Sequence, residues 1–370
     1  MLSLLALPVL TLAPALPQER IFLTSGKILE VRRVTAETFE KVEYETESRA
    51  RGSKDAAEVV KIEHDLSSPA LDDYVAGLAL MEEQGDFAGA IGAFDVVLED
   101  QRLMNNRRLW WVKPYALWNR ARCLAALQDP KGVQETVDQL LREVPDTFFY
   151  APALMLKAET TAAAGDPDLA RGFYRDLARA VDEKGLPEKW RAWSELGLLL
   201  LDDKKTPATR QRELQAMAEK FRGVYDDVAS RAEVEVGNAM VQAGDYAQAE
   251  GFFRRILESG HADDRTRAAA WAGLGDCAFQ RGLKALETDT EKAREAFREA
   301  ALAHLRVATL HRDVRRIVPR SLYYAAVALD RMGEAERRSE AITIVRRLSQ
   351  AFPNSSWTDR ALTDLRLKRG

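Results

Sequence analysis

A short pattern occurs three times in the sequence after residue 70. Each copy has a Gly, an Ala five positions later and a Phe or Tyr nine positions later, and the copies begin at Gly85, Gly165 and Gly244. Self-similarity of this kind indicates supersecondary units that stack on their neighbours, because one unit alone cannot bury its hydrophobic face. The pattern therefore predicts a repeat architecture over most of the 370 residues.

Each position of the pattern has a physical role. Gly can end a helix because it readily adopts the positive φ that helix termination often requires. The Asp after each Gly, for example Asp245, can accept a hydrogen bond at the start of the next helix. The small Ala lets two antiparallel helices approach closely, and the ring four residues later lies on the same face and fills the remaining space. We therefore expect antiparallel helix pairs in which Ala249 is buried and Ala247 faces solvent.

This pattern resembles the tetratricopeptide repeat (TPR). Trp193 and Trp271 are each followed by Leu and Gly three and four positions later, which is similar to the W-x-x-L-G start of that repeat. The resemblance covers residues 72–367 and implies a mainly α protein, a right-handed TPR-like α-solenoid of about seven or eight helix pairs. An insertion around residues 284–295 should lengthen the pair that starts at Trp271, and such departures leave the curvature of the solenoid open.

A small all-β module should precede the solenoid, because residues 18–66 have a period near two, which is typical of half-buried strands. We expect a barrel-like module of four or five short strands, with strands near residues 21–23, 28–34, 42–47 and 59–62 and a mobile polar loop over residues 48–57. Ser67-Ser68-Pro69 forms the boundary, and residues 70–370 form the solenoid.

Residues 1–17 are apolar, but the run is too short and too interrupted by Pro to span a bilayer. An apolar stretch followed by Ala13-Pro14-Ala15 is typical of a secretory signal peptide with an A-x-A cleavage site. No Lys or Arg precedes the stretch, so a plain hydrophobic N-terminus is the alternative. We expect cleavage after Ala15, no transmembrane helix, and a bacterial protein that is exported to the periplasm or secreted; a cytoplasmic location is the alternative.

Charge is distributed unevenly along the chain. In total, 54 basic and 58 acidic residues give a net charge of −4, and a nucleic-acid binder would need a basic surface, so we expect no nucleic-acid partner. Residues 301–370 nevertheless hold 14 basic and 7 acidic side chains. Arg312 and Arg316 lie in this segment, and Pro319 should end their helix near residue 318. Two interpretations remain open: a solvated helix end, or a docking face for an acidic partner.

Residues that could support catalysis or metal binding are few. Cys123 and Cys277 lie in apolar helical patterns and should be small buried hydrophobic residues. His304 and His311 are two helical turns apart, about 10 Å along the axis, which is too far to share one metal ion. We expect both histidines at the surface or in a groove, and we expect no enzymatic activity, cofactor, metal or small-molecule substrate.

An aromatic segment over residues 107–118 contains four aromatic residues among three cations. Trp118 lies four residues after Pro114, which should start a helix, and it is expected to face inward. Trp110 and Trp111 have two interpretations. They cover the core beneath a long connection between helix pairs, or they stay partly exposed and contact a partner.

Together these observations favour a non-enzymatic scaffold in the cell envelope that binds a protein or peptide partner on the solenoid surface. Candidate partner-binding residues come from first helices of pairs, from the aromatic segment and from the basic end: Trp110, Trp111, Asn119, Arg122, Asn238, Gln242, Arg312 and Arg316. The alternative function is a structural envelope component that binds peptidoglycan or another glycan through Trp110 and Trp111.

Overall fold

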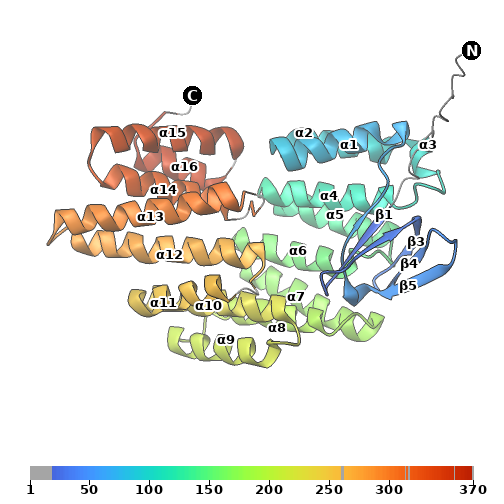
Figure 1. Ribbon diagram of the computed structural model, residues 1–370, viewed down its shortest axis with the longest axis horizontal. Coiled ribbons are helices and arrows are strands. Elements are labelled where there is room, and N and C mark those ends of the chain that lie inside the picture. The colour runs from blue at the N-terminus through green and yellow to red at the C-terminus, as the bar shows by residue number, and fades with distance from the viewer. Residues whose placement is uncertain (1–18, 260–261, 313, 316, 354, 369–370) are drawn as a thin grey trace, which may run out of the picture.

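The computed structural model describes residues 19–259, 262–312, 314–315, 317–353 and 355–368. Strands occupy the first part of the chain and helices the rest, as Figure 1 shows. The expected fold class, a mainly α helical repeat preceded by a small all-β module, is confirmed. The expected leader over residues 1–17 and Arg316 lie outside the described residues. In the part of the chain that is described, the helices lack the length and apolar character that crossing a membrane requires.

The β module consists of two three-stranded antiparallel sheets. Its strands are β1 (Glu19–Leu23), β2 (Ile28–Val31), β3 (Arg33–Glu37), β4 (Lys41–Glu45), β5 (Arg51–Asp55) and β6 (Val59–Glu63). One sheet has the order β2-β1-β6 and the other has the order β3-β4-β5. Both sheets contribute to one apolar core that includes Ile21, Val34 and Val42. The apolar residues that alternate along the strands are therefore the ones whose side chains face this core.

The expected mobile loop over residues 48–57 is wrong, because β5 pairs along its length with β4. β5 lies at the edge of its sheet, and none of its residues is buried. A strand that buries neither face needs no alternation of apolar residues, so the sequence carried no strand pattern there. Gly52 also lets β5 pass under the ring of Tyr44, since a Cβ at Gly52 would come within 2.5 Å of the Tyr44 Cζ.

Fourteen of the described helices form seven consecutive pairs, in agreement with the expected seven or eight pairs, and the short helices α3 and α16 lie outside the pairs. The first pair is α1 (Asp72–Ala79), which continues as the π-helical turn η3 (Leu80–Gln84), and α2 (Phe87–Glu99). The other pairs are α4 (Val112–Ala126) with α5 (Pro130–Glu143), α6 (Tyr150–Ala163) with α7 (Pro167–Lys184), α8 (Lys189–Leu200) with α9 (Pro207–Phe221), α10 (Asp226–Ala243) with α11 (Tyr246–Glu258), α12 (Asp264–Ala285) with α13 (Thr290–Leu310), and α14 (Val318–Arg331) with α15 (Ala335–Ala351). The remaining short elements are η1 (Ala56–Glu58), η2 (Pro69–Leu71), α3 (Gln101–Met104) and α16 (Ser356–Asp364).

The turns within pairs follow the pattern seen in the sequence. The Gly residues that begin the three copies have positive φ, +71° at Gly85, +88° at Gly165 and +86° at Gly244. Asp86 and Asp166 each accept a hydrogen bond from a backbone N–H in the first turn of the following helix, at 2.9 and 3.0 Å. Asp245 makes no such bond, so its expected capping role is not realised.

The expected packing within pairs is confirmed. Ala249 has no exposed surface and Ala247 is exposed. The aromatic residue of each copy presses against a Gly of a neighbouring helix, where a Cβ would collide with the ring. Phe94 and Phe253 press on Gly77 and Gly237 in the first helix of their own pair, and Tyr174 presses on Gly197 in the first helix of the next pair. Small residues on one helix therefore accommodate large residues on its neighbour. The longest pair, α12–α13, has helices of 22 and 21 residues, as expected from the insertion.

The expected end of a helix at Pro319 is wrong. Helix α13 already ends at Leu310, and α14 begins at Val318 with Pro319 in its first turn. Pro fits that position because the first N–H groups of a helix have no partner within it. Arg312 therefore lies in the connection between the two helices, and Arg320 lies near the start of α14.

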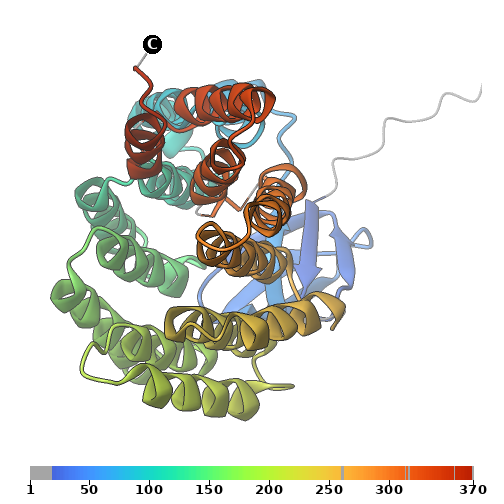
Figure 2. The same ribbon diagram turned by 90° about the vertical axis from the view of Figure 1, so that its left-hand side faces the viewer.

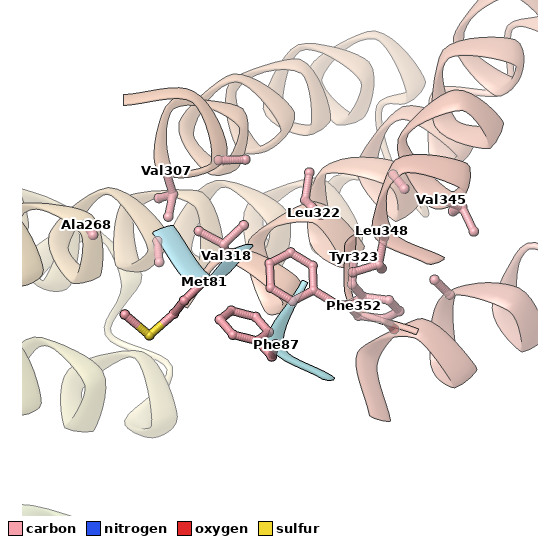
Figure 3. Close-up of a cluster of buried hydrophobic side chains, with 14 of the residues drawn as sticks. Met81, Phe87, Ala268, Val307, Val318, Leu322, Tyr323, Val345, Leu348 and Phe352 are labelled. Carbon is pink, nitrogen blue, oxygen red and sulfur yellow. The ribbon is translucent and has the colours of Figure 1, made fainter. Parts of the chain in front are cut away.

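The helix pairs follow an arc that brings the two ends of the solenoid together (Figure 2). One apolar cluster joins α1, α2 and α4 to α12–α16, and in it Met81 and Phe87 lie beside Val318 (Figure 3). Arg265 of α12 also forms an ion pair with Glu159 of α6, with 3.1 Å between Nη2 and Oε1. The curvature that the sequence left open thus closes the first helix pairs onto the last ones.

The β module is fixed to the second and third helix pairs. Thr38, just after β3, forms an antiparallel bridge with Thr147 in the connection between α5 and α6. The hydroxyl of Tyr115 on α4 donates a hydrogen bond of 3.0 Å to Glu37 of β3. These contacts place the module against the start of α4, where the aromatic segment lies.

Candidate functional site

A cavity of about 1080 Å³ lies where the first and last helix pairs meet. One wall comes from η3, α2, α4 and α6, and the other comes from the α13–α14 connection, α14 and the start of α16. The two walls meet where the backbone N–H of Ser356 donates a hydrogen bond of 3.5 Å to the side chain of Gln128. The cavity is thus a product of the closure of the solenoid.

Three arginines line this cavity, and two of them are among the residues expected to bind a partner. Arg122 comes from α4, and Arg312 and Arg315 come from the connection between α13 and α14. Glu82 is the one acidic side chain among the described residues of the lining. The resulting excess of positive charge favours an anionic ligand.

Aromatic side chains lie beside these cations. The guanidinium of Arg315 lies over the ring of Phe87 at 4.9 Å, and Arg360 lies over the ring of Trp357 at 4.9 Å. Phe87 and Trp357 both line the cavity, so it offers apolar surface as well as charge. Neither Phe87 nor Trp357 was among the candidate residues expected from the sequence, because neither belongs to a local binding motif.

Asn119 was expected to contact a partner, but it is only 5% exposed. Its Nδ2 donates a hydrogen bond of 3.2 Å to the Tyr74 hydroxyl, and its Oδ1 accepts one of 3.0 Å from Nη1 of Arg122. α4 turns Asn119 toward α1, so the side chain is covered by the preceding helix pair. Asn119 therefore holds Arg122 at the cavity, and the expected contact with a partner is corrected to a positioning role.

The other expected polar candidates lie elsewhere. Asn238 and Gln242 lie on α10 and do not line the cavity. Asn238 donates a hydrogen bond of 3.0 Å to Glu235 on its own helix, and Gln242 is exposed. The fold thus brings Arg122 and Arg312 together at the cavity, and Asn238 and Gln242 lie away from it. Arg316 lies outside the described residues.

The expected contact of Trp111 with a partner is wrong. Trp111 is 3% exposed, and its ring stacks on His64 with 4.1 Å between centroids and 4° between planes. Trp110 is half-buried and packs against the core of the β module. The module covers both tryptophans, which the sequence could not reveal because it does not place the module. Trp118 packs inward as expected, with its ring stacked on Phe149 at 5.3 Å.

A buried ionic cluster joins the β module to the helices. The side chain of His64 is 1% exposed, with Nδ1 3.1 Å from Glu19 Oε1 and Nε2 2.6 Å from Glu37 Oε1. Burial disfavours the charged ring, but the close contacts with the two glutamates outweigh it and raise the pKa of His64 to about 9. At neutral pH the cluster is therefore an imidazolium between two carboxylates. The sequence did not predict this cluster, because its members are far apart along the chain and form no local pattern.

The expectation that His304 and His311 lie at the surface or in a groove is wrong for both, because neighbouring helices cover His304 on α13 and His311 just after it. His304 has no exposed surface, and burial lowers its pKa to about 3, so its ring is neutral. Nearby, burial raises the pKa of Asp276, although Arg320 opposes this with hydrogen bonds of 2.8 and 2.7 Å. His311 is 7% exposed, and its Nδ1 lies 2.6 Å from a carboxylate oxygen of Asp264.

The two cysteines are buried, as expected. Burial raises the pKa of the Cys123 and Cys277 thiols to about 12, so both stay protonated at neutral pH. Within the described residues, no three His, Cys, Asp or Glu side chains are grouped so that they could hold a metal ion.

No protein-family model and no curated protein matches this chain. Among solved structures, the C-terminal part of a TPR repeat-containing protein from Cytophaga hutchinsonii is similar over 79% of this chain and 99% of its own, at 14% identity and a TM-score of 0.34. The P58(IPK) TPR domain is similar over 81% of this chain and 89% of its own (13% identity, TM-score 0.27), and yeast Tom70 over 80% and 88% (14% identity, TM-score 0.24). At such low scores, the fold rests on the chain's own helix pairs and their packing.

Proposed function

We propose that this chain is a non-enzymatic scaffold that binds an acidic segment of a partner protein in the cavity between its first and last helix pairs. The convergence of Arg122, Arg312 and Arg315 on one cavity carries the proposal. Arg122 is far from the other two in the sequence. The cationic lining therefore depends on the fold and is not a single solvent-exposed stretch of basic residues.

The chemistry of the lining suits a peptide that carries carboxylates. A guanidinium can donate two parallel hydrogen bonds to one carboxylate, and the rings of Phe87 and Trp357 offer apolar surface to the side chains between the acidic ones. The volume of about 1080 Å³ lies at the upper end of the roughly 300–1,000 Å³ that is usual for small-molecule pockets, so the cavity has room for a short peptide segment.

Fluorescence anisotropy with a labelled peptide that alternates Glu and Ala tests the proposal, with the matched Gln–Ala peptide as the control ligand. Arg122→Ala and Arg312→Ala should each weaken binding about tenfold or more, because a hydrogen bond between charged groups contributes about 1.5–3 kcal/mol. Arg212→Ala changes an exposed arginine of α9 outside the cavity and should bind as the wild type does.

Binding should also weaken steeply between about 50 mM and about 500 mM salt, because salt screens exposed charges. Two results would overturn the proposal. One is an affinity that stays unchanged in both arginine variants or across the salt series. The other is tighter binding of a single-stranded oligonucleotide that depends on the same arginines, which would indicate a nucleic-acid partner instead.

Glycan binding through Trp110 and Trp111 has little structural support, because the β module covers Trp111 and packs against Trp110. We further propose that the scaffold acts in the bacterial cell envelope. The support is the apolar run over residues 1–17 with its A-x-A pattern, which is typical of exported proteins.

A further inference from the structure

We propose that the β module tunes ligand binding in the cavity, because a chain of buried contacts runs from His64 through Trp111, Tyr74 and Asn119 to Arg122. The inference rests on the proposed function, since it requires Arg122 to contact the ligand. It gives the β module a role that neither the repeat pattern nor the cavity alone suggests. Asn119, Tyr74, Trp111 and His64 are positioning residues in this proposal.

The chain of contacts begins where the module meets the helices. His64 lies between Glu19 of β1 and Glu37 of β3, and its ring stacks on Trp111 just before α4. Tyr115 of α4 lies edge-on to the His64 ring at 5.2 Å and donates its hydroxyl to Glu37. Two buried carboxylates need the cation between them, so the docked module fixes the place of the ring on which Trp111 stacks.

The middle part of this series of contacts, from Trp111 to Tyr74, is close-packed. The rings of Trp111 and Tyr74 meet edge to face with 5.6 Å between centroids, and they are 3% and 2% exposed. Phe94 packs on the Tyr74 ring at 5.8 Å. Protein interiors have little free volume, so Tyr74 cannot keep its position if Trp111 shifts.

The last step reaches the cavity through hydrogen bonds. Tyr74 accepts the hydrogen bond of Asn119, and Asn119 accepts that of Arg122, at 3.2 and 3.0 Å. Asn119 is buried, whereas Arg122 is exposed on the lining. A free Arg side chain loses rotamer entropy when it binds a ligand. An Arg122 that Asn119 already restrains loses less, so the intact chain of contacts raises affinity.

Two variants interrupt the series of buried contacts without changing a residue of the cavity lining. Tyr74→Phe removes only the hydroxyl that accepts from Asn119, and His64→Gln removes the buried cation. With the Glu–Ala peptide, each should weaken binding about threefold to tenfold, and neither should weaken it further in an Arg122→Ala background, because coupled neighbours are non-additive. Tyr246→Phe is the matched control, since Tyr246 lies on α11 outside the cavity, and it should bind as the wild type does.

The pH profile of the affinity, measured where circular dichroism shows that the protein is still folded, gives a second readout that a loss of stability alone would not produce. Loss of the proton from His64 leaves two buried carboxylates against a neutral ring, so wild-type affinity should fall as the pH rises through about 9. Burial raises the pKa of Tyr74 and of Tyr115 above the usual range, so neither tyrosine loses its proton in that interval. His64→Gln should show a flat profile there.

The outcomes separate this inference from the proposed function. If Arg122→Ala weakens binding but Tyr74→Phe and His64→Gln do not, the coupling is refuted and the cavity remains the binding site. Equal losses with and without Arg122 would also refute it, since the effect would then act through general stability. If Arg122→Ala itself binds as the wild type does, the proposed function fails. Should His64→Gln not fold, Tyr74→Phe decides the matter.

Discussion

Substituting Gly237 by Ala should destabilise the fifth helix pair, because Gly237 leaves room for the ring of Phe253. A Cβ at Gly237 of α10 would lie 2.5 Å from Cε1 of that ring. The ring has little room to move, since Gly273 of α12 also lies against it, and a Cβ there would lie 2.7 Å from Cε1. Phe253 has no exposed surface, so the extra methyl group must displace a ring held between three helices.

The magnitude follows from two opposing terms. Gly→Ala within a helix gains about 0.5–1 kcal/mol, because Gly loses more backbone entropy on folding. Overpacking a close-packed core costs about 1–3 kcal/mol. Gly237→Ala should therefore cost about 1 kcal/mol on balance. Gly251→Ala on the exposed side of α11, where nothing lies within 4 Å of a new Cβ, should instead stabilise by about 0.5–1 kcal/mol.

Native-state hydrogen exchange of the amides in α10, α11 and α12 is the suitable assay, because repeat arrays open locally and do not unfold in one step. The two variants should shift the opening free energy in opposite directions. In a Phe253→Leu background, which removes the ring, the penalty of Gly237→Ala should shrink toward the Gly251→Ala value. Stabilisation by Gly237→Ala, or a penalty that does not depend on residue 253, would refute the packing argument.

Three further predictions concern other parts of the chain. Ala249→Leu, at a position without exposed surface, should cost about 1–3 kcal/mol by overpacking, and Ala247→Leu should cost little; equal midpoints in urea would contradict the register. The pKa of His64 in the folded protein, about 9, is above the ordinary value of 6.5, so the stabilising effect of His64 is complete below pH 6.5 and is lost as the pH rises through about 9; if the wild type stays more stable than His64→Gln by the same amount above that pH, the argument is contradicted. Intact-mass analysis of protein from its native host should show a mature chain that starts near Leu16, and a cytoplasmic chain that retains Met1 would rule out export.

Features that act over a few residues could be read from the sequence. Gly85 and the two other repeat glycines end helices with positive φ, and Asp86 caps the following helix, because turn chemistry depends on adjacent positions. Helix pairing was readable for a related reason: Ala249 and Phe253 pack against a helix close to them in the chain. Strand β5 was not predicted, because an edge strand needs no buried face. The early end of α13 was not predicted either, because a Pro such as Pro319 fits the first turn of a helix as well as the end of one.

The helix pairs, their approximate number and the small β module could be predicted from the order of residues along the chain. Which side chains meet across the arc depends on how the pairs are arranged in space. Small rotations between successive pairs add up along a solenoid, and their sum brings Arg122 to the same cavity as Arg312. The docking of the β module likewise buried Trp111 and completed the site around His64. No periodicity encodes these contacts, because they join residues that belong to different repeats and different modules.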